Sequence, residues 1–437
     1  MEGPGGKSFT GFGFGPIQSA LFLYEAYRSG NFESFTAADI DQELVEAVRA
    51  NGGRYTVNIA RPGRIDRFTV EGVELCNPGD PQGRRKIVAA VARSEELCTA
   101  LPSVAAYPAG GAASVASLLA EGLAARERPL PTIIYTAENH NRAAELLEEQ
   151  LRARAAGRAL EGVQILNTVI GKMSGVITDP AAIARLELAP ITPRIPRAVL
   201  VEEFNRILIS TVRLPGYRRG IEVFVEKDDL LPFEEAKLYG HNAIHALIAY
   251  LADLKGWRTI AEAGKDPWIM GTARRAFIEE SGAALIHRHA RLGDRLFSAE
   301  GYAEYADDLL RRMINPNLND LVERVGRDPA RKLAIDDRLY GTMSLALEAG
   351  IEPRHLALGA AAGIAFLLRR AGSGVAAPSL PTGLRLPEAP GRLSEPELAS
   401  LLAALWGEAG RASPHAARLQ ELSWKAVLEL RAMALPA

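Results

Sequence analysis

The stretch "KLYGHNAIH" (237–245) sets three side chains capable of acid–base or hydrogen-bonding chemistry, Lys237, Asn242 and His245, among mostly small or apolar neighbours. Apolar residues follow at helical spacing, so the stretch is predicted to begin a helix. At ~100° per residue the three side chains fall within an arc of roughly 140°, so they can face one cleft. Such a set can take up a proton and bind an oxygen that gains negative charge. The alternative is a solvated helix start.

A glycine-rich turn lies near the N-terminus, in "GFGFGP", where Gly11 and Gly13 follow a predicted strand and precede a predicted helix. A dinucleotide-binding turn needs the first glycine for its tight bend and the second so that a pyrophosphate can approach the backbone and the helix N-terminus. Pro16 replaces the third glycine of this motif, which the first helical turn tolerates, and Gly15 can compensate. A plain glycine-rich turn is the alternative.

A carboxylate stands at the position that such a turn requires. Asp39 ends the next predicted strand, 26 residues after Gly13, close to the expected interval of about 20. A carboxylate there can bind the adenosine ribose hydroxyls and repel a 2′-phosphate, so NAD is favoured over NADP. The alternative is that Asp39 caps a helix or turn.

The first half of the chain alternates strand-like and helix-like segments, which predicts an α/β fold with a Rossmann-like, doubly wound parallel sheet over residues 1–205. Its predicted strands include "SFTGFGFG", "SFTAADID", "TIIYTAEN" (132–139) and "AVLVEEF" (198–204).

The second half is predicted to be a mostly α-helical domain over residues 206–373. Its long amphipathic stretches are 241–255, 269–290, 299–314, 338–350 and 355–370. Residues 371–392 are rich in Gly and Pro and read as a linker or surface loop. Residues 374–437 therefore form a linker and a C-terminal helical tail, expected to pack on the helical domain.

The composition is that of an ordinary globular protein: 437 residues, 48% apolar and 24% charged, with a net charge of −2. No basic excess indicates nucleic acid. The two cysteines, Cys76 and Cys98, make no ligand-like pattern and fit a reducing compartment. No signal-peptide core and no run of about 18 apolar residues occur, so we expect a soluble cytoplasmic protein without membrane contact. A monomer and a homodimer both remain open.

Together these motifs resemble the polyol-specific long-chain dehydrogenases, the mannitol dehydrogenase family, from the glycine turn to about residue 370. The strongest marker is the pattern K-x4-N-x2-H, met as Lys237, Asn242 and His245. The stretch "NPNLNDLVERVGRDPARKLAIDDRL" (315–339) is similar to the mannitol-1-phosphate 5-dehydrogenase branch. The stretches "VEEFNRILI" (201–209) and "AENHNR" (137–142) are looser matches.

The resemblance implies a role for each marker residue. Lys237 corresponds to the general base that takes the hydroxyl proton as hydride leaves for the nicotinamide. Asn242 matches a group that hydrogen-bonds the developing alkoxide, and Asn139 corresponds to its partner on the opposite wall. His245 resembles a residue that orients substrate hydroxyls. No metal is expected.

The segment "ERVGRDPARK" holds four cations, of which the resemblance places the first and last, Arg324 and Lys332, near the substrate's polar end. An arginine fork grips a phosphate with paired hydrogen bonds, which favours a sugar phosphate over a free polyol. The four predicted substrate-binding residues are Arg324, Arg327, Arg331 and Lys332. The alternative is a solvated loop paired with nearby acids, namely Glu323, Asp328, Asp336 and Asp337.

The chain departs from the family at three places, which puts the substrate in doubt. Ser210 stands where the family often has an acidic residue, and the Asp-Arg pair that the family often has near Gly171 and Lys172 is absent. The segment "RLPGYRRGIEV" (213–223) is an unfamiliar insertion. Of the other histidines, His287 and His289 are predicted to lie on a solvated helix face, and His241 to point away from the motif.

These observations predict an NAD-dependent polyol(-phosphate) dehydrogenase with its site between the nucleotide and helical domains. The expected reaction interconverts D-mannitol 1-phosphate and D-fructose 6-phosphate or a close analogue. One alternative keeps the cofactor and changes the substrate to a free hexitol or a hexonate/hexuronate pair. Another is a non-catalytic nucleotide-sensing protein, motivated by Pro16 and Ser210.

Overall fold

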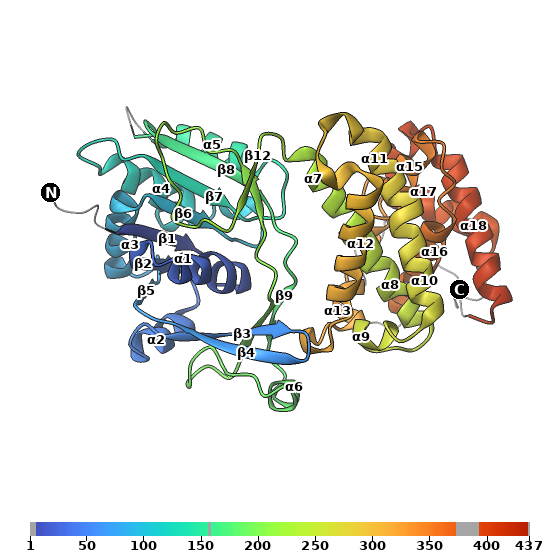
Figure 1. Ribbon diagram of the computed structural model, residues 1–437, viewed down its shortest axis with the longest axis horizontal. Coiled ribbons are helices and arrows are strands. Elements are labelled where there is room, and N and C mark those ends of the chain that lie inside the picture. Colours follow the sequence, from blue (N-terminus) through green and yellow to red (C-terminus); the bar gives the residue numbers. More distant parts are fainter. Residues whose placement is uncertain (1–5, 156–158, 373–392, 436–437) are drawn as a thin grey trace. The chain divides into compact units, whose positions relative to one another are not determined.

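The computed structural model describes residues 6–155, 159–372 and 393–435 of the chain. The chain divides into two compact units, Met1–Leu231 and Pro232–Ala437. All described strands lie in the first unit, and the second is helical (Figure 1). The predicted fold class, an α/β Rossmann-like region followed by a mostly helical one, is confirmed.

The first unit is built on an eight-stranded sheet whose central six strands are parallel. Counted along the chain, these six have the order 3-2-1-4-5-6, the arrangement of dinucleotide-binding folds. In spatial order they are β5 (Val73–Cys76), β2 (Phe32–Ala38), β1 (Lys7–Phe12), β6 (Glu96–Thr99), β7 (Thr132–Thr136) and β8 (Val163–Val169). Two short strands extend the sheet beyond β8: β11 (Leu208–Ser210), which pairs antiparallel with it, and β12 (Val225–Lys227).

The register of these strands places their carboxyl ends at one edge. Phe12, the last residue of β1, lies opposite Ala38 of β2 and Thr99 of β6. Strand order reverses beside β1, and ligands of such sheets bind outside the carboxyl ends at that point. The glycine turn directly follows Phe12, so the fold places it at this edge.

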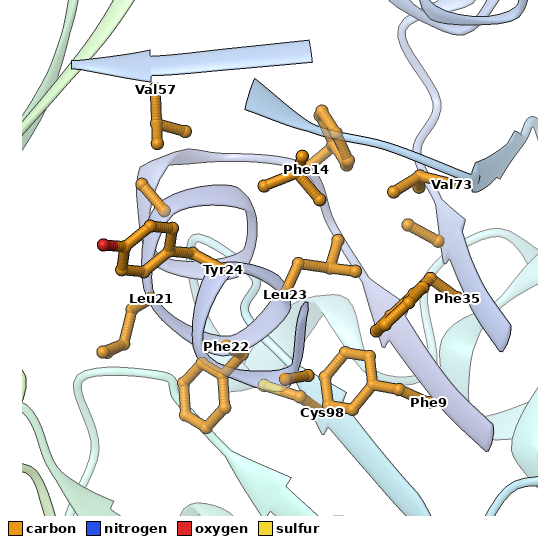
Figure 2. Packing of buried hydrophobic residues seen from close by; sticks show 14 of the residues in the cluster. Phe9, Phe14, Leu21, Phe22, Leu23, Tyr24, Phe35, Val57, Val73 and Cys98 are labelled. Carbon is orange, nitrogen blue, oxygen red and sulfur yellow. The ribbon is translucent and has the colours of Figure 1, made fainter. Parts of the chain in front are cut away.

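Both faces of the sheet are covered, as a doubly wound sheet requires. On one face, Phe12 of β1 clusters with Ile87 of α3 (Pro81–Arg93), with Leu118 of α4 (Val115–Ala124) and with α5 (Ala143–Arg152). The other face carries Phe9, which clusters with Phe22 and Leu23 of the first helix (Figure 2). That helix comprises a π-helical turn, η1 (Gln18–Phe22), and α1 (Leu23–Ser29), and α2 (Gln42–Ala50) lies in the same layer.

A second sheet of four strands packs into this same layer through Tyr55, Val57 and Val199. Its order is β4 (Arg64–Val70), β3 (Tyr55–Arg61), β10 (Ala198–Glu202) and β9 (Ser174–Ile177). A short helix, α6 (Pro180–Arg185), follows β9 along the chain.

The second unit is all-helical in its described residues. Besides short 3-10 turns, it contains α7 (Leu231–Glu235), the π-helical turn η4 (Ala236–Asn242), α8 (Ala243–Leu254), α9 (Ile260–Ala263), α10 (Pro267–Arg275), a further π-helical turn η5 (Ala276–Gly282), α11 (Ala283–His289), α12 (Ala299–Met313), α13 (Val322–Gly326), α14 (Pro329–Lys332), α15 (Tyr340–Glu348), α16 (Arg354–Gly372), α17 (Glu395–Ala412) and α18 (Ala416–Ala432).

Helix α8, which continues the predicted site helix, is buried at every residue except His245 and Asp253, because it lies in the core of this unit. Helix α16 approaches it through two glycines. A Cβ on Gly359 would lie 2.7 Å from Leu247, and one on Gly363 would lie 2.9 Å from Tyr250. The close packing that these glycines permit holds α8, and therefore the residues at its start, in one position.

The unit boundary differs from the one expected at residue 205, because β11 and β12 pair with the sheet of the first unit and keep the chain there up to Leu231. The three-part division itself stays a prediction.

Helix α18 packs on α16, and Trp406 of α17 donates its indole N–H to the Leu333 carbonyl oxygen. Most of the predicted loop 371–392 lies outside the described residues. None of the helices in the described ranges is both long and apolar enough to span a membrane.

Candidate active site

The glycine turn has the tight geometry that the sequence predicted. Gly13 has a φ of 81°, and a Cβ there would lie 2.6 Å from the Ala100 carbonyl oxygen. A Cβ on Gly11 would lie 2.2 Å from the Gln18 side chain. Pro16 stands in the first helical turn, as expected, while no described atom beyond its chain neighbours lies within 4 Å of a Cβ built on Gly15. Packing within the protein therefore demands glycine at 13, whereas a Cβ at 11 would displace the Gln18 side chain and a Cβ at 15 would meet no such atom.

Asp39 lies beside this turn. Its Oδ2 accepts a hydrogen bond from the Phe14 amide at 2.6 Å, and its Oδ1 accepts one from the Asp41 amide at 2.8 Å. The carboxylate thus links the glycine turn to the end of β2. Asp39 therefore does cap a turn, as the alternative interpretation of this residue expected. The same contacts place a negative charge at the carboxyl edge of the sheet.

Asn139 is exposed just beyond the carboxyl end of β7, at the same edge. Its neighbour Glu138, which the sequence reasoning missed, is buried and accepts hydrogen bonds from Thr99 Oγ1 at 2.9 Å, from the Leu101 amide at 2.9 Å and from the Tyr107 hydroxyl. Burial raises the pKa of Glu138, although these hydrogen bonds oppose the shift. Glu138 therefore ties together the loops that follow β6 and β7.

Lys237 lies in the π-helical turn η4 of the second unit and is half-buried. Burial lowers the pKa of its ammonium to about 8; Arg338 acts in the same direction and Glu234 opposes it. Arg338 is a further residue that sequence reasoning missed. Its guanidinium Nε lies 2.7 Å from Asp337, and its charge also lowers the pKa of Lys332.

The π-helical geometry changes which side chains share a face. In an α-helix, Lys237 and Asn242 diverge by roughly 140°. A π turn has more residues per turn than an α-helix, with backbone hydrogen bonds between residues five apart, so Lys237 and Asn242 diverge less here than they would in an α-helix. The turn is supported from outside: the Tyr239 carbonyl oxygen accepts hydrogen bonds from Ser281 Oγ at 2.9 Å and Thr342 Oγ1 at 3.1 Å.

His245 follows three residues after Asn242, on the first turn of α8, where residues three apart are neighbours. Its Nε2 lies 3.0 Å from Oδ2 of the buried Asp320. Arg324 binds the other carboxylate oxygen of Asp320, with Nε at 3.0 Å and Nη2 at 2.5 Å. Nothing in the sequence motif indicated Asp320.

The predicted basic cluster is largely occupied by internal contacts. Besides Arg324, Arg331 pairs with Asp337 at 3.2 Å, which the solvated-loop alternative anticipated. Lys332 is buried and donates to the Val325 carbonyl oxygen. Burial, and then the positive charges around it, lower the pKa of Lys332 to about 7. Arg327 is exposed.

Two histidines differ from expectation. His241 is buried, with its ring 6.1 Å from the His245 ring, and burial lowers its pKa well below the usual value, so it is neutral near pH 7. His289 is mostly buried and places Nε2 2.6 Å from Oε2 of Glu235, so it is not on a solvated face. His287 is exposed, as predicted.

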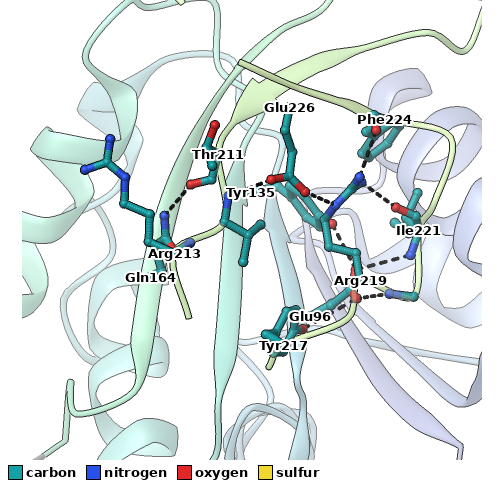
Figure 3. Close-up of polar contacts among 12 residues, drawn as sticks. Glu96, Tyr135, Gln164, Thr211, Arg213, Tyr217, Arg219, Ile221, Phe224 and Glu226 are labelled. Atoms are coloured by element: carbon teal, nitrogen blue, oxygen red, sulfur yellow. Dashed lines mark hydrogen bonds and ion pairs between the residues drawn. The ribbon is translucent and has the colours of Figure 1, made fainter. Parts of the chain in front are cut away.

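The insertion 213–223 is anchored at the opposite edge of the sheet from the glycine turn. The buried Glu96, first residue of β6, accepts hydrogen bonds from the Gly220 amide and, at 3.0 Å, from the Tyr135 hydroxyl (Figure 3). The Tyr217 hydroxyl donates to the Glu95 carbonyl oxygen at 2.8 Å. Arg219 binds Glu226 of β12 and so ties the insertion to the strand that follows it. The insertion is therefore a scaffold at the amino ends of the strands.

This placement makes a prediction. Tyr217→Phe removes the hydrogen bond to the Glu95 carbonyl oxygen, so the free energy of unfolding should fall by about 1 kcal/mol. Because the insertion lies away from the carboxyl edge, NADH affinity and kcat/KM should be unchanged. Chemical denaturation and steady-state kinetics check both parts; a kinetic change at unchanged stability would contradict the scaffold role.

The structure thus collects the predicted residues into two sets. The first set lies at the carboxyl edge of the parallel sheet in the first unit and comprises Gly11, Gly13, Gly15, Asp39 and Asn139. The second set lies at the start of one helix in the second unit and comprises Lys237, Asn242 and His245. Among the described residues, no group of three or more His, Cys, Asp or Glu side chains could hold a metal ion.

Residues 229–384, which include the site helix and the basic cluster, match the model of the mannitol dehydrogenase C-terminal domain. This match supports the predicted polyol dehydrogenase family. The mannitol-1-phosphate branch stays a prediction.

Two solved structures resemble the chain along nearly its whole length. Mannitol 2-dehydrogenase of Pseudomonas fluorescens, solved as a ternary complex with NAD and D-mannitol, has 16% identity and a TM-score of 0.70 over 98% of this chain and 92% of that one. A D-sorbitol dehydrogenase in substrate-free form has 14% identity and a TM-score of 0.73 over 98% and 93%. At these identities the likeness shows a shared fold.

Proposed function

We propose that this chain, whose residues 229–384 match a mannitol dehydrogenase C-terminal domain, is an NAD-dependent polyol dehydrogenase with Lys237 as its general base. The observation that carries the proposal is the half-buried lysine with a pKa of about 8, which shares a π-helical turn with Asn242. A base with a pKa near the working pH is well matched to proton transfer.

The reaction removes a hydride from a carbinol carbon and the proton from its oxygen, which leaves a carbonyl. NAD, when bound, supplies the hydride acceptor. Unprotonated Lys237 takes the O–H proton, and Asn242, five residues on, donates a hydrogen bond to the oxygen as negative charge develops. Preorganised donors of this kind contribute ~3 kcal/mol each. Asn139 is proposed as the second donor, as the family resemblance implies.

NAD fits the groups at the carboxyl edge of the sheet. The backbone at Gly13 has no side chain to hinder a pyrophosphate, and the helix that begins at Pro16 presents its N-terminal amides. Asp39 adds a carboxylate beside this turn, which would bind ribose hydroxyls and repel a 2′-phosphate.

Within this proposal a free polyol, such as a hexitol, accords better with the contacts than a polyol phosphate does. Asp320 and Asp337 already neutralise Arg324 and Arg331, and Lys332 is buried on a backbone carbonyl. A phosphate grip would have to break these contacts or use Arg327 alone.

D-mannitol 1-phosphate with D-fructose 6-phosphate is the second candidate pair. The observation in its favour is the crowding of cations: burial lowers the pKa of Lys332 most, and Arg338, Arg331 and Arg327 lower it further while Asp328 opposes them. An anion bound there would relieve this repulsion.

The test measures NADH oxidation with free fructose and fructose 6-phosphate side by side, in wild type and in Arg327→Gln. We expect kcat/KM for fructose at least equal to that for the phosphate, and no effect of Arg327→Gln. Turnover that requires the phosphate and falls in Arg327→Gln would establish the second candidate. NADH binding without turnover of either would lead to hexuronates and then to the nucleotide-sensing alternative.

A further inference from the structure

We propose that Asp320 is a positioning residue that fixes the ring orientation and the tautomer of His245, so that the imidazole presents a hydrogen-bond acceptor at Nδ1 to a substrate hydroxyl. The inference deepens the proposed function and rests on it, because it assigns the residue that makes His245 competent to orient a polyol.

The facing atoms of the two side chains are buried and close together. His245 Nε2 and Asp320 Oδ2 are 3.0 Å apart, at ion-pair distance, and neither atom has a hydrogen bond to any other described residue that could replace this contact. The His245 side chain is 12% exposed and that of Asp320 is 3% exposed. Water therefore cannot easily replace either partner, and each buried atom depends on the other.

Asp320 is itself held rigidly. Arg324 binds its Oδ1 with two nitrogens, and the Asp320 carbonyl oxygen accepts a hydrogen bond from the Ile260 amide at 2.9 Å. A β-bridge between Thr259 and Leu321 joins the same two segments. The carboxylate is thus fixed by contacts on both its side chain and its backbone, as a group that orients another group must be.

The charge state of Asp320 selects the tautomer. Burial alone raises the pKa of Asp320, but His245 and Arg324 outweigh burial and hold it below its usual value. An ionised carboxylate only accepts hydrogen bonds, so Nε2 of His245 must carry the hydrogen. In the neutral imidazole, Nδ1 is then the acceptor.

This reading gives Arg324 a different role from the one the sequence indicated. Its guanidinium supports Asp320, and through it His245, so Arg324 acts on the substrate indirectly. Burial lowers the pKa of His241 so far that this neighbouring ring is neutral. The charged group that contacts His245 is therefore Asp320.

The activity test is a double-mutant cycle of Asp320→Asn, His245→Ala and the double variant, with exposed Asp336→Asn as the matched control. The amide that Asp320→Asn introduces can donate a hydrogen bond to the imidazole and so impose the other tautomer of His245.

We expect Asp320→Asn to raise KM for the polyol about 10- to 100-fold with a smaller effect on kcat and none on NADH affinity. In the His245→Ala background, Asp320→Asn should add nothing to KM, because partners that act together are non-additive. Additive effects on KM would overturn the proposal.

A second measurement needs no turnover. In protein with ¹⁵N-labelled histidines, His245→Ala identifies the His245 signals, whose shifts report the tautomer. We expect the Nε2–H form in the wild type and its loss in Asp320→Asn. A wild-type His245 with hydrogen on Nδ1 alone would overturn the proposal, even if Asp320→Asn does not fold. If the wild type turns over no polyol yet shows the Nε2–H form, the proposed function fails while the positioning contact stands.

Discussion

Lys237→Ala should lower kcat for polyol oxidation by about 10²- to 10⁴-fold, the range that a general base contributes. NADH affinity, measured by fluorescence titration, should stay within about twofold of wild type, because the cofactor contacts of the proposal lie at the glycine turn. Loss of kcat with cofactor affinity retained would distinguish a missing base from a damaged fold.

The pH dependence follows from the pKa of about 8 that burial gives Lys237. Oxidation needs the free amine, so kcat/KM for the polyol should rise with pH and level off above about 8. Reduction needs the ammonium as proton donor, so kcat/KM for the ketose should fall as pH rises through the same value. Both inflections should vanish in Lys237→Ala.

The matched control is Lys265→Ala, since Lys265 is an exposed lysine in the same unit. Its kinetics and pH profile should equal those of the wild type. Near-wild-type kcat in Lys237→Ala, with the inflection near pH 8 retained, would assign the base to another residue.

Gly13→Ala should weaken NADH binding roughly tenfold or more, equivalent to about 1.4 kcal/mol. The added Cβ would lie 2.6 Å from the Ala100 carbonyl oxygen, and the φ of 81° is unfavourable for alanine. The turn must shift to relieve the contact, which moves the amides that would face a pyrophosphate. Isothermal titration with NADH measures the loss.

The control for backbone strain is Gly30→Ala, at the other end of the same helix. Gly30 has a φ of 69°, but a Cβ there meets no atom within 4 Å. This variant should lose stability by about 1 kcal/mol and keep the affinity for NADH. Equal affinity loss in both variants would mean that strain on the helix, and not the shape of the turn, accounts for the effect.

Local sequence determined much of what matters here. Gly13, the helix that follows it and the alternation of apolar strands with amphipathic helices all depend on neighbours within one or two turns, so pattern and glycine chemistry predicted the doubly wound sheet and its edge. Helical periodicity likewise predicted the all-helical second unit. Lys237, Asn242 and His245 could be singled out because their residue types are unusual beside an apolar stripe.

Tertiary contacts decided the rest. The π turn that holds both Lys237 and Asn242 is supported by Ser281 and Thr342, 39 and 100 positions further along the chain than Asn242, and no sequence periodicity indicates it. The partner of a charged side chain is decided by which acid folds against it, so Arg324 contacts Asp320, and His289 contacts Glu235. Likewise, the position of the insertion 213–223 is decided by a long-range contact, the hydrogen bond from the Gly220 amide to the buried Glu96.

One physical reason separates the features that the sequence predicted from those that only the tertiary structure decided. Backbone conformation at a turn or along a helix is largely set by residues close in sequence, which a single chain displays directly. The pKa of Lys237 and the orientation of His245 depend on burial and on charges brought near by folding. The sequence by itself thus determined which chemical groups are present and on which elements they lie, and the tertiary structure decided which of them meet and in what state of charge.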